Sequence, residues 1–168
     1  MILRFAGYVI LAAVSLGIAA AQVKLGVINS QQAVFGTAEF KKWRVDEETK
    51  FKPRQDQLLK LQKDLQDIQT QLQGGKLSPQ GEQELTAQAQ RKQREGQRLQ
   101  QDYQDDLDRE QNEELQKIGT RMRELVGKLA DSKGLDAVVD AANMVFFKPA
   151  LDVTPDAITA YDKAFPLK

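Results

Sequence analysis

Hydrophobic and polar positions follow different patterns along the chain, and the changes divide it into four stretches. An apolar stretch with a single charge, Arg4, opens the chain, and a short strand-like stretch at 23–29 (VKLGVIN) follows it. A long polar region from Gln31 to about Ser132 then carries apolar residues at helical spacing, and the last section is apolar again. The pattern predicts an α+β protein, mostly α, with strands at both ends of the helical region.

The first stretch has the layout of a secretory signal peptide. Arg4 supplies a positive charge, residues 5–18 are apolar and uncharged, and three small residues at 19–21 end the segment. The apolar run is shorter than the roughly 20 residues that a membrane-spanning helix needs. We therefore expect a cleaved signal peptide over residues 1–21 and a mature protein in the periplasm.

The helical region predicts a long first helix with one narrow apolar stripe. Apolar residues recur there at steps of three and four, as in a heptad repeat, at Leu58, Leu61, Leu65, Ile68 and Leu72. Polar residues, many of them glutamine, occupy the other positions. This narrow stripe is typical of a coiled-coil seam, and it favours a helix that extends away from a compact domain.

A glycine-rich turn separates this helix from a second one. We expect Gly74 to take the left-handed conformation that ends many helices, with Gly75 beside it. Ser78 is expected to cap the second helix and Pro79 to open it. Since two long helices joined by a short turn run antiparallel, we expect a hairpin arm over 46–124 with its tip at 74–79.

The expected register of the hairpin places large residues of the first helix opposite small ones of the second. With the turn centred near Lys76 and Leu77, Leu58 faces Gly96, which would let the helices approach closely. Phe51 falls near Tyr103 in the same register.

One proline lies inside the first helix of the hairpin. Pro53 removes a backbone hydrogen bond there and predicts a kink within one turn of its position. Two interpretations stay open, because the kink could be a fixed bend or a hinge that lets the arm splay.

Gly134 is expected to end the second helix, and the last section then predicts two strands and a final helix. The strands are expected at 135–140 (LDAVVD) and 144–147 (MVFF), with a turn at 141–143 between them. Thr154 is expected to cap the last helix, with Pro155 at its first position.

These segments predict a small head that forms oligomers, made of residues 22–45 and 125–168 around the inserted arm. A head of this size is close to the limit at which one hydrophobic core suffices. Its strands are too apolar for a sheet with one face in water, so we expect them to pack against other copies of the chain. The residues expected at this interface are Val27, Ile28, Val138, Val139, Val145, Phe146 and Phe147.

Composition excludes several kinds of chemistry. The 168 residues include no histidine and no cysteine, so disulfides, thiol catalysis and the commonest general base are excluded. Lys and Arg number 24, as do Asp and Glu, and this zero net charge argues against nucleic-acid binding. Gly75-Lys76 lacks the flanking residues of a phosphate-binding loop. We expect no catalytic residue, no cofactor and no metal site, and hence no enzyme.

The ordered combination of segments resembles the Skp (OmpH-like) family of periplasmic chaperones. The residues that carry the resemblance are 24–29 (KLGVIN), 77–79 (LSP), 135–140 (LDAVVD) and 152–154 (DVT). The resemblance implies a homotrimer with a β-barrel-like head and three helical arms around a cavity. It also implies that the cavity holds unfolded outer-membrane β-barrel proteins without ATP. A coiled-coil structural or adaptor protein of the cell envelope is the alternative.

Two further contacts are expected on the arm. The mobile distal residues Leu72, Leu77 and Leu85 are the expected contacts with an unfolded client. Three arginines, Arg91, Arg94 and Arg98, share one helical face and could make weak contact with anionic lipid, but a solvated face is the preferred interpretation. This chain differs from the basic members of the family in its neutrality and in its acidic stretch at 102–114.

Overall fold

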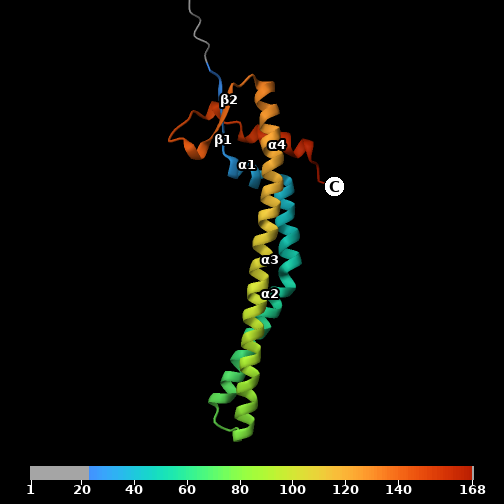
Figure 1. The fold of residues 1–168 in the computed structure, drawn as a ribbon, viewed down its shortest axis with the longest axis vertical. Helices are drawn as coiled ribbons and strands as arrows, with labels where there is room; N and C mark the ends of the chain where they lie inside the picture. The colour runs from blue at the N-terminus through green and yellow to red at the C-terminus, as the bar shows by residue number, and fades with distance from the viewer. Residues whose placement is uncertain (1–22, 168) are drawn as a thin grey trace, which may run out of the picture.

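The molecule consists of a small head at one end of a long helical arm (Figure 1). The computed structural model describes residues 23–167, so the signal peptide expected over residues 1–21 lies outside the described part. The elements are, in order, β1 (Leu25–Ile28), α1 (Ser30–Gly36), α2 (Ala38–Gln73), α3 (Pro79–Lys133), β2 (Ala137–Asp140), η1 (Ala141–Asn143), η2 (Pro149–Leu151) and α4 (Thr154–Ala164). This order confirms the α+β class, mostly α, with the helical hairpin between two strands.

Helices α2 and α3 form the arm and run antiparallel (Figure 1). They have 36 and 55 residues, so α3 is about 80 Å long at 1.5 Å per residue. Ser78 caps α3 as expected, since its Oγ accepts a hydrogen bond of 3.1 Å from the Gly81 amide. Gly134 ends α3 with a left-handed φ of 62°.

The expected conformation of the tip is wrong by one residue. Gly74 is right-handed, with φ −68° and ψ −14°, and its amide still bonds to carbonyls of the last turn of α2. Gly75 carries the left-handed φ of 64° instead. Gly74 therefore caps α2 in a right-handed conformation, and the second glycine takes the left-handed one.

Aromatic and charged pairs fix the register of the arm. Phe51 packs edge-to-face on Tyr103, with ring centroids 5.5 Å apart, which confirms the expected pair. The Lys92 ammonium lies 2.6 Å from the Asp64 carboxylate towards the tip. Towards the head, Arg54 pairs with Asp106, several residues further along α3 than the expected register places its partner. Long side chains reach along the helix axis there, so these ion pairs join residues that are not directly opposite.

In the head, β1 and β2 pair in parallel, although more than one hundred residues separate them. The register runs from Leu25 opposite Ala137 to Ile28 opposite Asp140. The other edge of β1 meets the chain near Asp152, where the Val153 amide donates to the Val27 carbonyl at 2.8 Å. Helix α3 returns the chain to the end of the head at which β1 begins, where the Asp136 amide donates to the Lys24 carbonyl at 2.8 Å, so β2 runs parallel to β1.

The head core lies where the helices cross at the base of the arm. Its buried members come from β1, all four α-helices and the loop before α4: Ile28, Ala33, Phe40, Ile118, Met122, Val153, Ala157 and Tyr161. Ile118 and Met122 lie within the range 46–124 that we expect to form the arm, so α3 passes from arm to core without a break.

The strand expected at 144–147 is wrong. Residues 141–143 form a 3₁₀ helix, and the Met144 amide bonds back to the Ala141 carbonyl. The chain then leaves β2 instead of folding back beside it. In the described part, the amides of Val145, Phe146 and Phe147 make no hydrogen bond, because this short turn leaves no neighbouring strand within reach.

The helix expected from Gln31 to Gln73 is interrupted at Thr37. This residue is extended, with ψ 147°, and its hydroxyl accepts a hydrogen bond from the Phe40 amide at 3.2 Å. Gly36 packs against Ile158 of α4, so closely that an added Cβ would lie 2.5 Å from the Ile158 Cδ1. The break lets α1 stay on the head while α2 leaves along the arm.

The cap expected for the last helix is also wrong. Thr154 is already the first residue of α4, which Val153 precedes. The Thr154 hydroxyl accepts a hydrogen bond of 2.9 Å from the Asn29 amide, so it ties α4 to the end of β1. Pro155 lies in the first turn, as expected.

Candidate functional site

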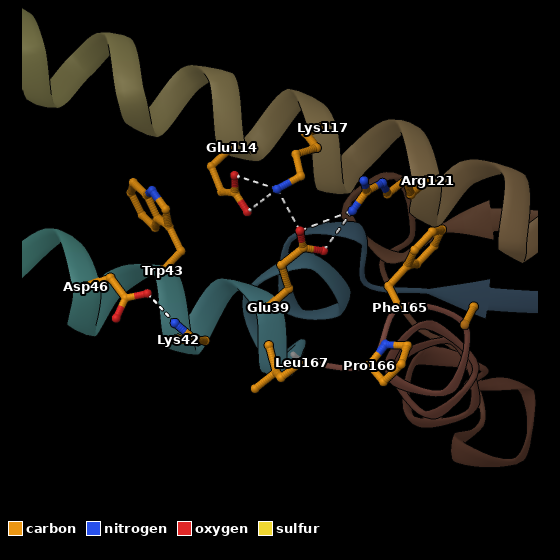
Figure 2. A pocket seen from close by; sticks show the side chains of 11 residues that line it. Glu39, Lys42, Trp43, Asp46, Glu114, Lys117, Arg121, Phe165, Pro166 and Leu167 are labelled. Atoms are coloured by element: carbon orange, nitrogen blue, oxygen red, sulfur yellow. Dashed lines mark hydrogen bonds and ion pairs between the residues drawn. The ribbon is translucent and has the colours of Figure 1, made fainter.

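Glu39, in the first turn of α2, lies at the centre of an ion-pair network where the arm joins the head (Figure 2). From α3, the Lys117 ammonium lies 2.6 Å from its carboxylate, and Arg121 donates to both oxygens at 3.1 Å. From α4, the Tyr161 hydroxyl donates to Glu39 Oε2 at 2.5 Å. One carboxylate therefore fixes the start of α2 against two other helices.

The network changes the pKa values of its members. Burial acts to raise the pKa of Glu39, but hydrogen bonds from Lys117 and Tyr161 and the charges of Lys117 and Arg121 outweigh it, so this pKa lies below its ordinary value. Burial, together with the hydrogen bond to Glu39, raises the pKa of Tyr161 to about 12. Glu39 therefore stays ionised and Tyr161 neutral over the whole physiological range.

A cavity of about 500 Å³ lies beside this network, and Trp43 and Phe165 contribute to its wall (Figure 2). The Arg121 guanidinium lies over the Phe165 ring, 4.5 Å from its centroid. Each charged side chain of the wall has a partner in the wall, including the pair of Lys42 and Asp46 at 2.5 Å. The charges are thus used to join elements, which makes this region a structural joint.

The residues expected at the head interface divide into three groups by their exposure. Val27 and Ile28 are buried within the chain itself, so they need no second copy to cover them. Val138, Val139 and Phe147 are half-buried. Val145 is fully exposed and Phe146 is 77% exposed, and both lie on the segment without backbone partners. Val145 and Phe146 therefore offer the largest apolar surface of this set to another molecule.

The expected client contacts and the hinge candidate lie along the arm. Leu77 at the tip is 37% exposed, whereas Leu72 and Leu85 are half-buried between the helices. Pro53 is exposed, and α2 continues on both sides of it. The roles of these residues stay predictions.

The three arginines expected to meet lipid are exposed on α3. Within residues 23–167, none of Arg91, Arg94 and Arg98 belongs to an ion pair. Their accessibility is compatible with contact to an anion and with a solvated face, so the lipid contact stays a prediction.

Sequence reasoning missed a groove of about 750 Å³ in the middle of the arm. Its floor includes Leu58, Leu61 and Leu65 of α2, and glutamines of α3 form much of its rim. The sequence feature that could have indicated this groove is Gly96, which lies opposite Leu58 in the expected register. We expected Gly96 to bring the helices together, but the space left by its missing side chain remains open.

Two further searches concern only the described residues. Within 23–167, no group of acidic side chains is arranged to hold a metal ion. No helix in this part of the chain is both long and apolar enough to cross a membrane.

Comparison with known proteins agrees with this architecture. The family model described as Outer membrane protein (OmpH-like) matches residues 24–161. A Skp-like protein of Pseudomonas aeruginosa is 26% identical over 140 residues, which are 82% of this chain and 83% of that protein. The crystal structure of an OmpH-like protein of Caulobacter crescentus CB15, described as an outer membrane chaperone, shares the fold with a TM-score of 0.71. It is 16% identical, and the match covers 88% of this chain and 89% of that one. Because the family model spans most of the sequence, the chain belongs to the OmpH-like family.

Proposed function

We propose that this chain is an ATP-independent holdase chaperone of the periplasm. In this proposal it forms a homotrimer through its head, and unfolded outer-membrane β-barrel proteins bind in a cavity between the three arms. The OmpH-like family is non-enzymatic, and membership in it supports a chaperone role in general. The description of the Caulobacter structure as an outer membrane chaperone agrees with this role.

The observation that carries the proposal is the exposed segment at 144–147. Val145 and Phe146 are exposed there, and the backbone amides of residues 145–147 have no partner in the described chain. Exposed apolar residues next to unpaired backbone favour pairing with another chain. A second and third copy would cover this surface and bring the arms side by side.

The arm has the properties that a holdase surface requires. Helix α2 has 36 residues, but only Phe40, Phe51, Leu61 and Ile68 are buried. A two-helix hairpin that buries so little is marginally stable away from the head and can adapt to clients of different shape. Contacts that are weak individually become strong when three arms act on one client, because the effective concentration rises.

The proposed clients need this kind of protection. Unfolded β-barrel proteins expose strand edges and apolar side chains, which pair with one another and aggregate. A cavity between polar arms would separate one client from the next without any input of nucleotide energy.

Suppression of client aggregation tests the proposal. A urea-denatured outer-membrane β-barrel protein is diluted into buffer with and without residues 22–168, in the absence of ATP, while light scattering is recorded. We expect the chain to keep scattering low at about one trimer per client. The oligomeric mass is measured on the same sample.

Two outcomes would contradict the proposal. Unchanged aggregation in the presence of an intact oligomer would favour the coiled-coil adaptor, which binds a folded partner and ignores unfolded chains. A monomeric mass at working concentration would exclude the cavity between arms.

A further inference from the structure

The geometry points to the groove in the middle of the arm as a binding site for one extended, uncharged segment of an unfolded polypeptide. The groove lies between α2 and α3 and has a volume of about 750 Å³. This inference rests on the proposed holdase function and specifies which part of a client the arm recognises.

The groove exists because α3 has a glycine where the seam requires a side chain. A Cβ added at Gly96 would lie 4.0 Å from the Leu61 Cδ1, with no closer side chain. Leu61 is buried at 7% exposure, whereas Leu58 and Leu65 beside it are half-buried. The floor of the groove is therefore apolar and only partly covered by the chain itself. An apolar side chain of a bound peptide would shield this floor from water, which favours binding.

Glutamines along α3 supply hydrogen-bonding groups at a spacing suited to an extended backbone. Gln93, Gln97, Gln100 and Gln104 recur at steps of four, three and four residues, or about 4.5–6 Å along the helix. Backbone groups that face the same side of an extended chain repeat about every 6.6 Å. Each carboxamide offers both a donor and an acceptor, which a peptide backbone requires.

Most of these amides are free to bind a partner. Within residues 23–167, the Gln93, Gln97 and Gln100 side chains have no hydrogen bond, whereas Gln104 donates to Asp108 at 3.0 Å. These three glutamines are exposed, and they line the groove together with the leucines of α2.

The charge of the groove selects its occupant. Asp105 is the one charged residue among the eleven that line it. Ion pairs between the helices bound it on both sides, Lys92 with Asp64 towards the tip and Arg54 with Asp106 towards the head. An acidic segment would lose hydration in the groove and meet Asp105, and a basic segment would find only this one carboxylate at one end, so uncharged segments are favoured over most of the groove. A neighbouring arm is a poor occupant for the same reason, because its surface is rich in charge.

The length of the groove sets the size of the segment. Its α3 wall runs from Gln93 to Asp105, about 18 Å along the helix axis. An extended chain covers that distance with about five or six residues. Alternate side chains of such a segment would point to the leucine floor and to water, which is the pattern of a β-strand with one apolar face.

A peptide-binding experiment with a groove-filling variant tests the inference. The probe is a fluorescein-labelled peptide of about eight residues with alternating Leu and Thr, capped at both ends. Its anisotropy is measured with residues 22–168 of the wild type and of Gly96→Leu, in which a side chain occupies the groove. We expect Gly96→Leu to bind about tenfold more weakly, although leucine in place of glycine stabilises the helix.

Matched controls separate filling from other effects. Gly127→Leu makes the same replacement on an exposed part of α3 that has nothing within 4 Å, and we expect unchanged affinity. The double variant Gln97→Glu with Gln100→Glu adds two negative charges to the rim while the side chains keep their size, and we expect weaker binding of the peptide. Gln83→Glu with Gln90→Glu adds the same charge to exposed positions that do not line the groove.

The outcomes distinguish this inference from the proposed function. Wild-type protein that suppresses client aggregation but does not bind the peptide, or binds it equally well after Gly96→Leu, overturns the groove and leaves the holdase intact. A changed oligomeric mass of Gly96→Leu with unchanged peptide affinity also overturns it, because the groove would then be an interface between copies. Failure of the wild type to suppress aggregation is a failure of the proposed function itself.

Discussion

At the scale of single residues, Glu39 has the largest number of consequences. It is one carboxylate with partners on two helices, Lys117 and Arg121 on α3 and Tyr161 on α4. Nothing in its sequence context marks it, because a glutamate in the first turn of a helix is ordinary and favourable for the helix dipole. Its role depends on residues about eighty and one hundred and twenty positions away.

Replacement of Glu39 by glutamine should lower the free energy of unfolding by about 1.5–3 kcal/mol, because two cations lose their shared partner. The pKa of Glu39 is lowered in the fold, so its contribution is fully present above 4.5 and is lost as the pH falls below that value. Thermal unfolding followed by circular dichroism from pH 7 to pH 3 measures this. We expect the gap between wild type and variant to narrow with acid, and a constant gap would contradict the prediction.

Glu47 has the opposite character, because the fold disfavours its charge. Its Oε1 is buried and has no hydrogen-bond partner among residues 23–167, and burial together with the nearby Glu110 raises its pKa. Glu47→Gln should therefore raise the free energy of unfolding at pH 7 by up to about 1 kcal/mol, and the gain should shrink as the pH falls and Glu47 becomes protonated. Glu48→Gln, at the exposed neighbouring position, should change stability little. Equal effects of the two variants would show that general charge, not burial, is responsible.

At the scale of elements, local signals define the ends of the helices well. Ser78 and Pro79 open α3, and Gly134 closes it, as their residue types predict. The errors occur where two candidates are adjacent or where a distant element intervenes. The two glycines of the tip are one such case, and Thr37, held against the head, is the other.

The two tip glycines should respond oppositely to alanine. Gly75→Ala forces a side chain into the left-handed region and should cost about 1 kcal/mol. The backbone at Gly74 is right-handed, which alanine adopts without strain, so Gly74→Ala should stabilise the helix end by about 0.5 kcal/mol. Hydrogen exchange of the amides around the tip measures both effects, and it should become faster in Gly75→Ala and slower in Gly74→Ala. If only Gly74→Ala destabilised the tip, Gly74 would be the left-handed residue, as we expect from the sequence.

Pro53 is the other local feature with a measurable consequence. Its missing amide leaves the Thr49 carbonyl without the helical hydrogen bond, so Pro53→Ala should stabilise the arm by about 1–3 kcal/mol. The measurement is hydrogen exchange of α2 near Thr49, which should slow in the variant. Unchanged exchange would mean that the helix already accommodates the proline, as a fixed bend would.

At the scale of the whole molecule, the head is incomplete in one copy. Helices and strands of one chain cover Val27 and Ile28, but nothing in the described part covers Val145 and Phe146. This difference between buried and exposed apolar residues supports the proposed association of several copies, whereas the number of three copies is what the family resemblance implies. The arm is oriented by the same head, because α3 runs continuously from one into the other.

Substitution of both exposed residues should therefore dissociate the oligomer and preserve the fold. For Val145→Asn with Phe146→Asn, we expect a monomeric mass by light scattering and unchanged helicity. The control is Leu59→Asn, since Leu59 is 63% exposed on the arm and should leave the mass unchanged. An intact oligomer of the double variant would place the interface elsewhere on the head.

The sequence by itself determined the parts of this protein that depend on neighbouring residues. The spacing of Leu58 to Leu72, the caps at Ser78 and Gly134, and the apolar ends of the chain were sufficient to predict a helical hairpin between strands. These signals act within one or two turns, so they can be identified without knowledge of any distant contact.

Only the tertiary structure decided the features that depend on distant partners. The parallel pairing of β1 with β2, the break at Thr37 against α4, and the network of Glu39 each join segments far apart in sequence. Residues 145–147 have the side chains of a strand, but a strand forms only when a neighbouring strand accepts its hydrogen bonds. No such neighbour lies within reach in the described part, so these residues stay unpaired. The groove at Gly96 likewise depends on how two helices pack, and residue types alone do not define the space between them.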